Sequence, residues 1–393
     1  MTDQATAEPE PATAPATDGT VRPLGVAVIG YEFMGRAHSN AWRNVAAFYP
    51  DVPPVRMQAL VGRDSDRVER AAAELGWAGA ATDWHEVLHR DDIDIVDVCA
   101  PGHLHAEMAL AALNAGKHVL VEKPLANSVA ACEELVAAAA AAPGTAMLGF
   151  NYRRVPALAL ARELVQEGRI GQVQQVRLSY LQDWLSDPQA PMTWRLRKET
   201  AGSGVLGDLG SHAVDQLHYL LGEHVTEVSG ALRTFVPERL GPHGTEAVTV
   251  DDAAWATLHA ASGAVASLEV SRVATGRKNA LTIEVYGTTG SLRFDLERLN
   301  ELVLTEVGDA RTSGASTILV TEEEHAYLKA WWPAGHVLGW DHTFTSQAAD
   351  FLRAIASGEP VHASFADGLA VQRVLEAIET SHGRDSTLTS TGN

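Results

Sequence analysis

The chain has 393 residues, of which 46% are apolar, so it can bury full hydrophobic cores and is long enough for two or three domains. Its 30 basic and 50 acidic side chains give a formal net charge of −20, the opposite sign to that expected of a protein that binds nucleic acid. The two cysteines, Cys99 and Cys132, are too few for a disulfide framework and are typical of a reducing compartment.

Residues 1–22 are rich in Ala, Thr, Pro and acidic side chains and are predicted to form a disordered tail. They lack the basic start and the apolar core of a signal peptide. No stretch of the sequence reaches the roughly 18 consecutive apolar residues of a membrane span. We therefore expect a cytoplasmic protein that does not bind membranes.

Strand and helix patterns alternate from residue 24 to residue 150. Apolar runs at 24–29, 55–61, 93–99, 118–122 and 145–150 predict buried strands, and helical patterns separate them at 34–47, 64–75, 104–115 and 128–142. This alternation predicts a doubly wound parallel sheet, and hence an α/β dinucleotide-binding domain over residues 23–150.

After Phe150 the pattern changes. Helical patterns at 155–167 and 205–221 flank a predicted strand at 173–184, and closely spaced strand patterns then follow at 225–236, 248–260, 264–273, 280–287, 290–296, 300–306 and 316–321. Further helical patterns occupy 344–356 and 368–381. Residues 151–382 are therefore predicted to form an α+β domain on an open, largely antiparallel sheet covered by helices on one face, and residues 383–393 to form a frayed tail.

The segment Gly30-Tyr-Glu-Phe-Met-Gly35 connects the first predicted strand to the first predicted helix. The dinucleotide fingerprint at this point is G-x-G-x-x-G; the first and third glycines are present, and Glu32 occupies the second position. The first glycine makes a tight turn, the third lets helix and strand pack closely, and the helix N-terminus faces the pyrophosphate. A carboxylate at the second position fits only if it points to solvent.

NAD selectivity usually rests on an acidic residue at the end of the second strand, which holds the ribose 2′-hydroxyl. In this chain that place reads Val61-Gly-Arg-Asp64, with Gly62 where the acid is expected. Arg63 can stack on adenine or accept a 2′-phosphate, and Asp64 is predicted to cap the following helix. These residues leave the choice between NAD and NADP open.

Glu122-Lys-Pro124 closes the fourth predicted strand, and Gly207-Asp-Leu-Gly-Ser-His212 lies in a predicted helix. Together with the Gly30–Gly35 loop and Pro101…His105, these motifs resemble the glucose–fructose oxidoreductase / inositol dehydrogenase / MocA family over about residues 24–382. The stretches Phe150-Asn-Tyr-Arg-Arg154, Tyr180-Leu-Gln-Asp-Trp184 and Ala201-Gly-Ser-Gly204 resemble the branch that contains levoglucosan dehydrogenase and related glycoside 3-dehydrogenases.

The resemblance implies an N-terminal Rossmann domain, a C-terminal domain with an open sheet, and nicotinamide-dependent chemistry on sugars. It favours NAD over NADP, because the branch does, and it implies a homodimer or homotetramer formed through the open sheet. Glu32 departs from the family pattern, as does Gly102, where an asparagine often follows the proline. The cofactor-binding residues expected on this basis are Gly30, Phe33, Met34, Gly35, Arg63, Pro101, His105, Glu122 and Lys123.

Oxidising a secondary alcohol needs a base for the hydroxyl proton and an acceptor for the hydride, which the cofactor provides. Lys123 ends a parallel strand, where ligands of such sheets bind, and can serve as the base or as a cation beside the alkoxide. Asp208 and His212 share one helix face, and the resemblance places both beside the lysine. Tyr152 matches a family residue that faces the sugar.

An aromatic residue beside hydrogen-bonding groups suits a sugar ring, and Gln182 and Trp184 offer this combination at a predicted strand end. The expected substrate-binding set is Lys123, Tyr152, Gln182, Trp184, Arg195, Arg197, Asp208 and His212. Trp331, Trp332 and His336 either line a substrate mouth or form an oligomer contact or local packing. The other histidines have no metal-ligand spacing, so we expect no metal site.

Arg197 lies in Trp194-Arg-Leu-Arg-Lys198, at a place that is more often neutral or acidic in the branch that this chain resembles. An added guanidinium near a sugar site can grip a carboxylate or a sulfonate, which would suit an anionic sugar such as a uronoside or a sulfoquinovoside. The alternative is a solvated charge run, or an ion pair with an acidic residue of this acidic chain.

Three functional hypotheses follow. The first is an NAD(P)-dependent dehydrogenase that oxidises a ring hydroxyl, C3 for preference, of a sugar, anhydrosugar or glycoside. The second is a redox-neutral, NAD-dependent glycosidase, in which oxidation at C3 is followed by elimination, hydration and re-reduction. The third is a non-catalytic sensor that binds a dinucleotide. Net NADH accumulation distinguishes the first hypothesis from the second.

Overall fold

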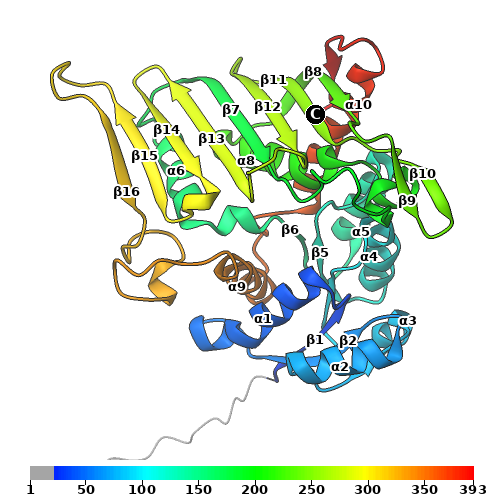
Figure 1. The fold of residues 1–393 in the computed structure, drawn as a ribbon. Coiled ribbons are helices and arrows are strands. Elements are labelled where there is room, and N and C mark those ends of the chain that lie inside the picture. The colour runs from blue at the N-terminus through cyan, green and yellow to red at the C-terminus, as the bar shows by residue number, and fades with distance from the viewer. Residues whose placement is uncertain (1–21) are drawn as a thin grey trace, which may run out of the picture.

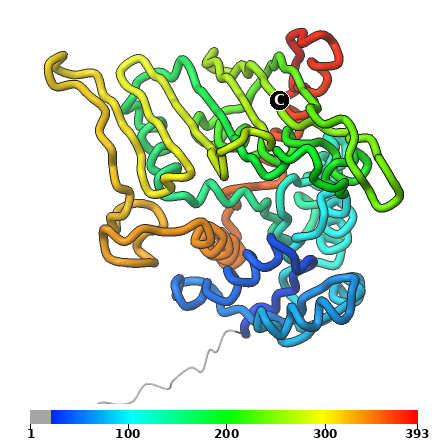
Figure 2. The backbone as a smooth tube through the Cα atoms, in the orientation of Figure 1, coloured from blue at the N-terminus to red at the C-terminus, as the bar shows by residue number. Residues whose placement is uncertain are grey.

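The computed structural model describes residues 22–393, so nearly all of the tail predicted at 1–22 lies outside the described residues (Figures 1 and 2). Arg22, the one residue of that tail within them, pairs with Asp94 at 2.5 Å. The chain forms two domains, each built around one large sheet, and the catalytic candidates come from both (Figure 1).

The N-terminal domain contains a six-stranded parallel sheet in the order β3-β2-β1-β4-β5-β6. Its elements are β1 (Leu24–Ile29), α1 (Phe33–Phe48), β2 (Val55–Val61), α2 (Ser65–Leu75), β3 (Ala80–Ala81), α3 (Trp84–Leu88), β4 (Ile95–Val98), α4 (His105–Asn114), β5 (His118–Glu122), α5 (Val129–Ala141) and β6 (Ala146–Gly149). This is the strand order of a Rossmann fold, and it confirms the predicted doubly wound sheet.

The helix cap that the sequence predicts at Asp64 is present in the structure. The Asp64 side chain caps α2 by accepting from the main-chain N–H of Arg67 at 3.1 Å, and α2 ends at Gly76, which has a φ of 77°. The elements β3 and α3 were not predicted. With two and five residues respectively, they are too short to produce a hydrophobic period.

The C-terminal domain contains a nine-stranded sheet in the order β16-β15-β14-β13-β7-β12-β11-β8-β17. Its elements are α6 (Pro156–Gln166), β7 (Val173–Leu181), α7 (Lys198–Ala201), α8 (Ser211–Leu221), β8 (Val225–Arg233), β9 (Glu238–Gly241), β10 (Gly244–Ala247), β11 (Ala253–Ala260), β12 (Val265–Ser271), β13 (Ala280–Gly287), β14 (Gly290–Asp295), β15 (Glu301–Glu306), β16 (Ala315–Leu319), α9 (His342–Ser357), α10 (Phe365–His382) and β17 (Thr389–Ser390).

The nine-stranded sheet is largely antiparallel, as predicted; the pair β12–β7 alone runs parallel within it. Helices α6, α8 and α10 pack on one face of the sheet (Figure 1). Along β11, Ala254, Ala256 and Leu258 are buried on that face, while Trp255 and Thr257 are exposed on the other. The period of two therefore separates a covered face from an open one.

The end of the chain differs from the frayed tail expected after residue 382. Strand β17 pairs antiparallel with β8 through Thr389 and Ser390. The Thr391 hydroxyl donates to the Val225 carbonyl at 2.8 Å, and its side chain is buried. A polar composition predicted fraying, but the backbone of the edge strand β8 offers partners that composition does not reveal.

The segment between β16 and α9 joins the two domains. In Figure 2 it descends in orange from the large sheet to the N-terminal domain. Trp331 packs against Phe48 of α1 with ring centroids 4.2 Å apart, and Trp332 meets the edge of the same ring at 5.5 Å. These two tryptophans therefore serve interdomain packing, one of the two alternatives left open for them.

Candidate active site

Lys123 links the end of the N-terminal sheet to the turn that precedes α8 in the C-terminal domain. It follows β5 directly, and its side chain is only 14% exposed. Its ammonium group donates to the Asp208 carboxylate at 2.8 Å and to the main-chain carbonyl of the same residue at 2.9 Å. The two strongest motifs of the sequence, far apart in the chain, therefore meet across the domain boundary.

Asp208 lies in an irregular turn. Residues Leu206–Gly210 form one turn of π-helix that runs directly into α8; such insertions are frequent at functional sites. The carboxylate of Asp251 fastens this turn by accepting from the main-chain N–H groups of Gly204 and Leu206, each at 2.8 Å. A side chain at Gly204 would place its Cβ 2.0 Å from the Asp251 carbonyl, so the close approach requires glycine.

His212 is buried within an aromatic pocket. Its ring centroid lies 4.6 Å from that of Tyr152 and 6.0 Å from that of Tyr180. Burial, and then the neighbouring Lys123 ammonium, hold the pKa of His212 well below its usual range, although Asp208 acts in the opposite direction. The imidazole is therefore neutral at neutral pH and able to accept a proton.

Lys123 and Asp208 are both charged. Burial acts to lower the pKa of Lys123, but Asp208, Glu122 and Tyr152 together outweigh it and the pKa is raised. Burial likewise acts to raise the pKa of Asp208, but Lys123, with smaller effects of His212 and Arg195, outweighs it and the pKa is lowered. Of the two roles considered for the lysine, the free protein therefore favours the cation over the base.

A row of hydrogen bonds begins at Tyr152, whose ring packs beside that of His212. The Tyr152 and Tyr180 hydroxyl groups lie 2.8 Å apart, and Tyr180 donates to the Asn279 side-chain oxygen at 2.7 Å. Gln182 donates to the same oxygen at 2.7 Å. Sequence reasoning missed Tyr180 and Asn279. The signal for Tyr180 was a phenol on the buried face of β7, whereas Asn279 carried none.

The other predicted substrate-binding residues, Trp184, Arg195 and Arg197, differ in their contacts. Trp184 is 45% exposed, with the Arg272 guanidinium 5.8 Å from its ring centre, and Arg195 lies 4.5 Å from the ring centre of Trp194. Arg197, by contrast, is paired with Glu246 at 2.5 Å. The structure therefore commits Arg197 to an ion pair within the chain, one of the two alternatives weighed for it.

The loop after β1 has the shape of a dinucleotide cradle. Gly30 has a φ of 111°, and a Cβ there would lie 2.6 Å from the Cys99 carbonyl. A Cβ at Gly35 would lie 2.0 Å from the Gly30 carbonyl, so both glycines are required by close backbone approach. Within residues 22–393, no side chain caps the N-terminus of α1. Its free N–H groups can therefore receive a pyrophosphate.

Glu32 does not obstruct this cradle. Its side chain is 75% exposed and pairs with Arg67 of α2 at 2.6 Å, so the carboxylate is held by the neighbouring helix. Phe33 is 66% exposed, and its ring stacks on Trp340 with centroids 5.4 Å apart and an interplanar angle of 5°. Met34 is partly buried against the core.

The other predicted cofactor residues lie at the ends of β2, β4 and β5. Gly62 leaves room for Tyr31, since a Cβ there would lie 2.0 Å from that ring. Arg63 follows Gly62 and is exposed. His105 lies 2.7 Å from the carbonyl groups of both Pro124 and Ala100, and so braces the loop that contains Pro101 against the loop after Glu122.

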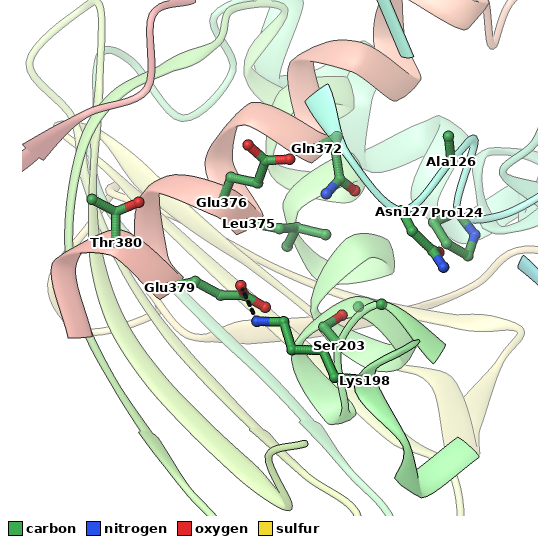
Figure 3. Close-up of a pocket in the computed structure, with 12 residues that line it drawn as sticks. Pro124, Ala126, Asn127, Lys198, Ser203, Gln372, Leu375, Glu376, Glu379 and Thr380 are labelled. Atoms are coloured by element: carbon green, nitrogen blue, oxygen red, sulfur yellow. Dashed lines mark hydrogen bonds and ion pairs between the residues drawn. The ribbon is translucent and has the colours of Figure 1, made fainter. Parts of the chain in front are cut away.

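A polar hollow of about 230 Å³ lies beside the loop that carries Lys123 and the turn that carries Asp208 (Figure 3). It is bounded by the loop after β5, the segment before the π turn, and α10. Two of its lining residues, Lys198 of α7 and Glu379 of α10, pair at 2.9 Å. Its lining includes Pro124 and Gly207, the immediate neighbours of Lys123 and Asp208, but neither of those two residues nor His212. The hollow is therefore adjacent to the reacting groups and separate from them.

Comparison with known proteins places this arrangement in a family. Residues 24–150 match the family described as "Oxidoreductase family, NAD-binding Rossmann fold", and residues 158–293 match the "GFO/IDH/MocA C-terminal domain". The chain belongs to the GFO/IDH/MocA oxidoreductase family. Its N-terminal domain is thus an NAD-binding domain, and NAD is its cofactor.

Three relatives illustrate the range of the similarity. Levoglucosan dehydrogenase of Pseudarthrobacter phenanthrenivorans is 38% identical over 92% of this chain and 97% of its own length. A solved structure of levoglucosan dehydrogenase with NADH and levoglucosan is 38% identical and superimposes with a TM-score of 0.91, covering 95% of this chain and 100% of that one. An oxidoreductase domain protein from Kribbella flavida is 51% identical, with a TM-score of 0.92, covering 94% of this chain and 100% of that one.

Among residues 22–393, no helix is long and apolar enough to cross a membrane.

Proposed function

We propose that this protein is an NAD-dependent dehydrogenase that oxidises a secondary ring hydroxyl, at C3, of a sugar, anhydrosugar or glycoside. The observation that carries the proposal is the contact of the Lys123 ammonium with Asp208, four residues before the buried His212, at the boundary of the two domains. A base and a fixed positive charge side by side are what removal of a proton from an alcohol requires.

The chemical roles divide as follows. His212 accepts the hydroxyl proton, and the Lys123 ammonium stabilises the negative charge that develops on the oxygen. Bound NAD provides the hydride acceptor, and the N-terminus of α1 with Gly30 and Gly35 provides its cradle. Asp208 orients the lysine through two contacts and presents a partly exposed carboxylate to a neighbouring sugar hydroxyl.

The sugar class is supported by the site and by its relatives. Tyr152, Gln182 and Trp184 offer hydrogen-bonding groups and an exposed aromatic face, which together match the polar rim and the apolar face of a pyranose. The relative named levoglucosan dehydrogenase acts on an anhydrosugar, and a further relative is named myo-inositol 2-dehydrogenase of Thermotoga maritima, 28% identical over 88% of this chain and 92% of its own length.

We also propose that the molecule is a homodimer or homotetramer formed through the open face of the nine-stranded sheet. That face presents Trp255, 40% exposed, beside polar side chains of β7 and β12. Size-exclusion chromatography with light scattering measures the assembly, and a monomer at micromolar concentration would refute this part of the proposal.

The deciding experiment follows NADH absorbance and product together, with NAD and a panel of levoglucosan, glucosides and free sugars. Stoichiometric NADH and a 3-keto product are expected. Release of the aglycone without NADH would instead identify the redox-neutral glycosidase, since oxidation at C3 acidifies the C2 proton and re-reduction consumes the NADH. Binding of NAD without turnover of any sugar would instead favour the third hypothesis, a non-catalytic sensor that binds a dinucleotide.

A further inference from the structure

A continuous row of buried polar groups leads to Lys123, and the proposed reaction uses only this last member of the row. It starts at Asp97 of β4, passes through His38 of α1 and Glu122 of β5, and ends at Lys123. Asp97 and His38 are in contact at 2.8 Å, and His38 and Glu122 at 2.9 Å. The other Glu122 oxygen accepts from the Lys123 main-chain N–H at 3.1 Å.

His38 is the centre of this row. Its two ring nitrogens face carboxylates on opposite sides, and the side chains of His38, Asp97 and Glu122 are all at most 5% exposed. A doubly protonated imidazole can donate to both carboxylates at once. Although burial acts to lower it, the pKa of His38 is raised well above its usual value, with Asp97 the largest opposing cause.

The groups around His38 leave it few other partners. Asp97, Cys99 and Glu122 face it from the sheet, and Trp42 of its own helix donates to the same Asp97 oxygen at 2.7 Å. From the C-terminal domain, Phe344 of α9 covers the ring at 5.3 Å. The candidate ligand atoms of His38, Asp97 and Cys99 lie within 4.8 Å of one another, but both His38 ring nitrogens are already in contact with carboxylates, so we assign no metal to this group.

Glu122 is confined as tightly as His38. A Cβ at Gly149 would lie 2.8 Å from a Glu122 oxygen, so glycine in the neighbouring strand provides the space that the carboxylate occupies. Its position therefore depends on its two partners, the His38 ring and the Lys123 main chain. The fixed main chain of Lys123, in turn, directs the ammonium toward Asp208.

We propose that His38 is a positioning residue that holds the Glu122 side chain in place, so that Lys123 keeps both its direction and its positive charge. This inference rests on the proposed role of Lys123. Without His38, the Glu122 side chain loses one of the two partners that hold it beside Lys123. Because Glu122 is one of the groups that raise the pKa of Lys123, its displacement lets the lysine lose its proton at lower pH than in the parent protein.

The first measurement does not depend on turnover. Competitive acetylation of the lysines, read by mass spectrometry across a pH series, reports the pKa of Lys123 in the whole protein with NAD bound. His38→Gln and Glu122→Gln are each expected to lower that pKa by at least one pH unit, while Lys198, which lies outside the row, stays unchanged. Glu122→Gln keeps the shape of the side chain and remains informative if His38→Gln does not fold.

The second measurement tests the consequence for the reaction. In both variants the alkaline limb of kcat is expected to move to lower pH, and kcat at neutral pH to fall about 10- to 100-fold, as when a supporting contact of a reacting group is lost. The matched control is Tyr49→Phe, which removes an α1–α9 hydrogen bond of 2.7 Å to Ser346 outside the row.

An unchanged Lys123 titration in a folded Glu122→Gln protein would overturn the inference, as would an equal shift in Tyr49→Phe. A shifted titration without any sugar turnover in the parent protein would keep the inference about the row and refute the proposed function, so the two failures are distinguishable.

Discussion

The ammonium of Lys123 donates both to the carboxylate and to the main-chain carbonyl of Asp208, at 2.8 and 2.9 Å. One side chain thus fixes the end of β5 to the π turn of the other domain at two points. The contact sets the distance between the cofactor domain and the catalytic helix, because each domain contributes one rigid partner. Its loss should therefore affect chemistry before it affects folding.

Replacing Lys123 by alanine is expected to lower kcat by ~10²- to 10⁴-fold, the range for losing a positioned proton-transfer or charge-stabilising group. Asp208 is 43% exposed and can be hydrated once its partner is gone, so the melting temperature and NAD affinity should change little. The control is Lys198→Ala, which removes a neighbouring lysine paired with Glu379. Near-normal turnover in Lys123→Ala would remove the lysine from the mechanism.

The pH dependence of kcat/KM follows from the two pKa directions. His212 must be neutral to accept a proton and its pKa is lowered, so activity should fall only well below about pH 6.5. Lys123 must be protonated and its pKa is raised, so the alkaline limb should lie above about pH 10.

Asp208→Asn tests the direction in which the two limbs of that pH profile move. The carboxylate raises the pKa of both His212 and Lys123, so its removal should move both limbs to lower pH. Asp183→Asn, which removes an acid paired with Lys278, is the control and should move neither limb. An acid limb above pH 7 in the parent protein would contradict the assignment of His212 as the base.

Much of this site could be predicted from short-range patterns. The strand ends that carry Gly30 and Lys123 follow from apolar runs, and the pair Asp208 and His212 follows from a helical spacing. The sequence predicts one helix over 205–221, whereas the structure has a π turn before α8 begins at Ser211. Such a turn is a single local irregularity, too short for a hydrophobic period to reveal it.

The remaining parts of the site depend on contacts between distant positions. Tyr180 and Asn279 are 99 residues apart, and His38 and Glu122 are 84 residues apart. A buried polar residue is visible in a sequence, but its partner is not, because the partner is fixed by sheet order and domain packing. The residues within each motif could therefore be predicted from the sequence, whereas the hydrogen-bonded contacts that connect the motifs could not.

Cofactor selectivity can be tested at Gly62. An aspartate there could hold a ribose hydroxyl, but its Cβ would collide with Tyr31 at 2.0 Å, so Gly62→Asp alone should weaken NAD binding. The double variant Tyr31→Ala, Gly62→Asp frees the space and is expected to raise the preference for NAD over NADP by ~10-fold, which corresponds to ~1.4 kcal/mol. Ratios of kcat/KM for the two cofactors measure it, and a double variant no more selective than the parent would refute this account.

The ion pair of Arg197 with Glu246 bears on substrate charge. A guanidinium already paired within the chain is a poor ligand for an anionic sugar, so Arg197→Gln should give equal, small losses of kcat/KM on a charged and a neutral glycoside. A loss of ~2–5 kcal/mol confined to the anionic substrate would show that Arg197 leaves Glu246 to bind it. Glu246→Gln is the matched variant, since it frees Arg197 and should improve only the anionic glycoside.

The carboxylate of Asp251 determines whether the π turn keeps its shape. It accepts from the N–H groups of Gly204 and Leu206 at 2.8 Å each, and all three residues are buried. Asp251→Ala leaves both donors without a partner, at a cost of ~1–3 kcal/mol for each buried group, and should lower both stability and kcat. Asp251→Asn retains one acceptor oxygen, so it should recover part of the stability measured by denaturant unfolding. Because the turn carries Asp208 and not the cofactor cradle, the affinity for NAD should stay close to that of the parent in both variants. A loss of NAD affinity as large as the loss of kcat would instead mean that Asp251 supports the whole domain boundary.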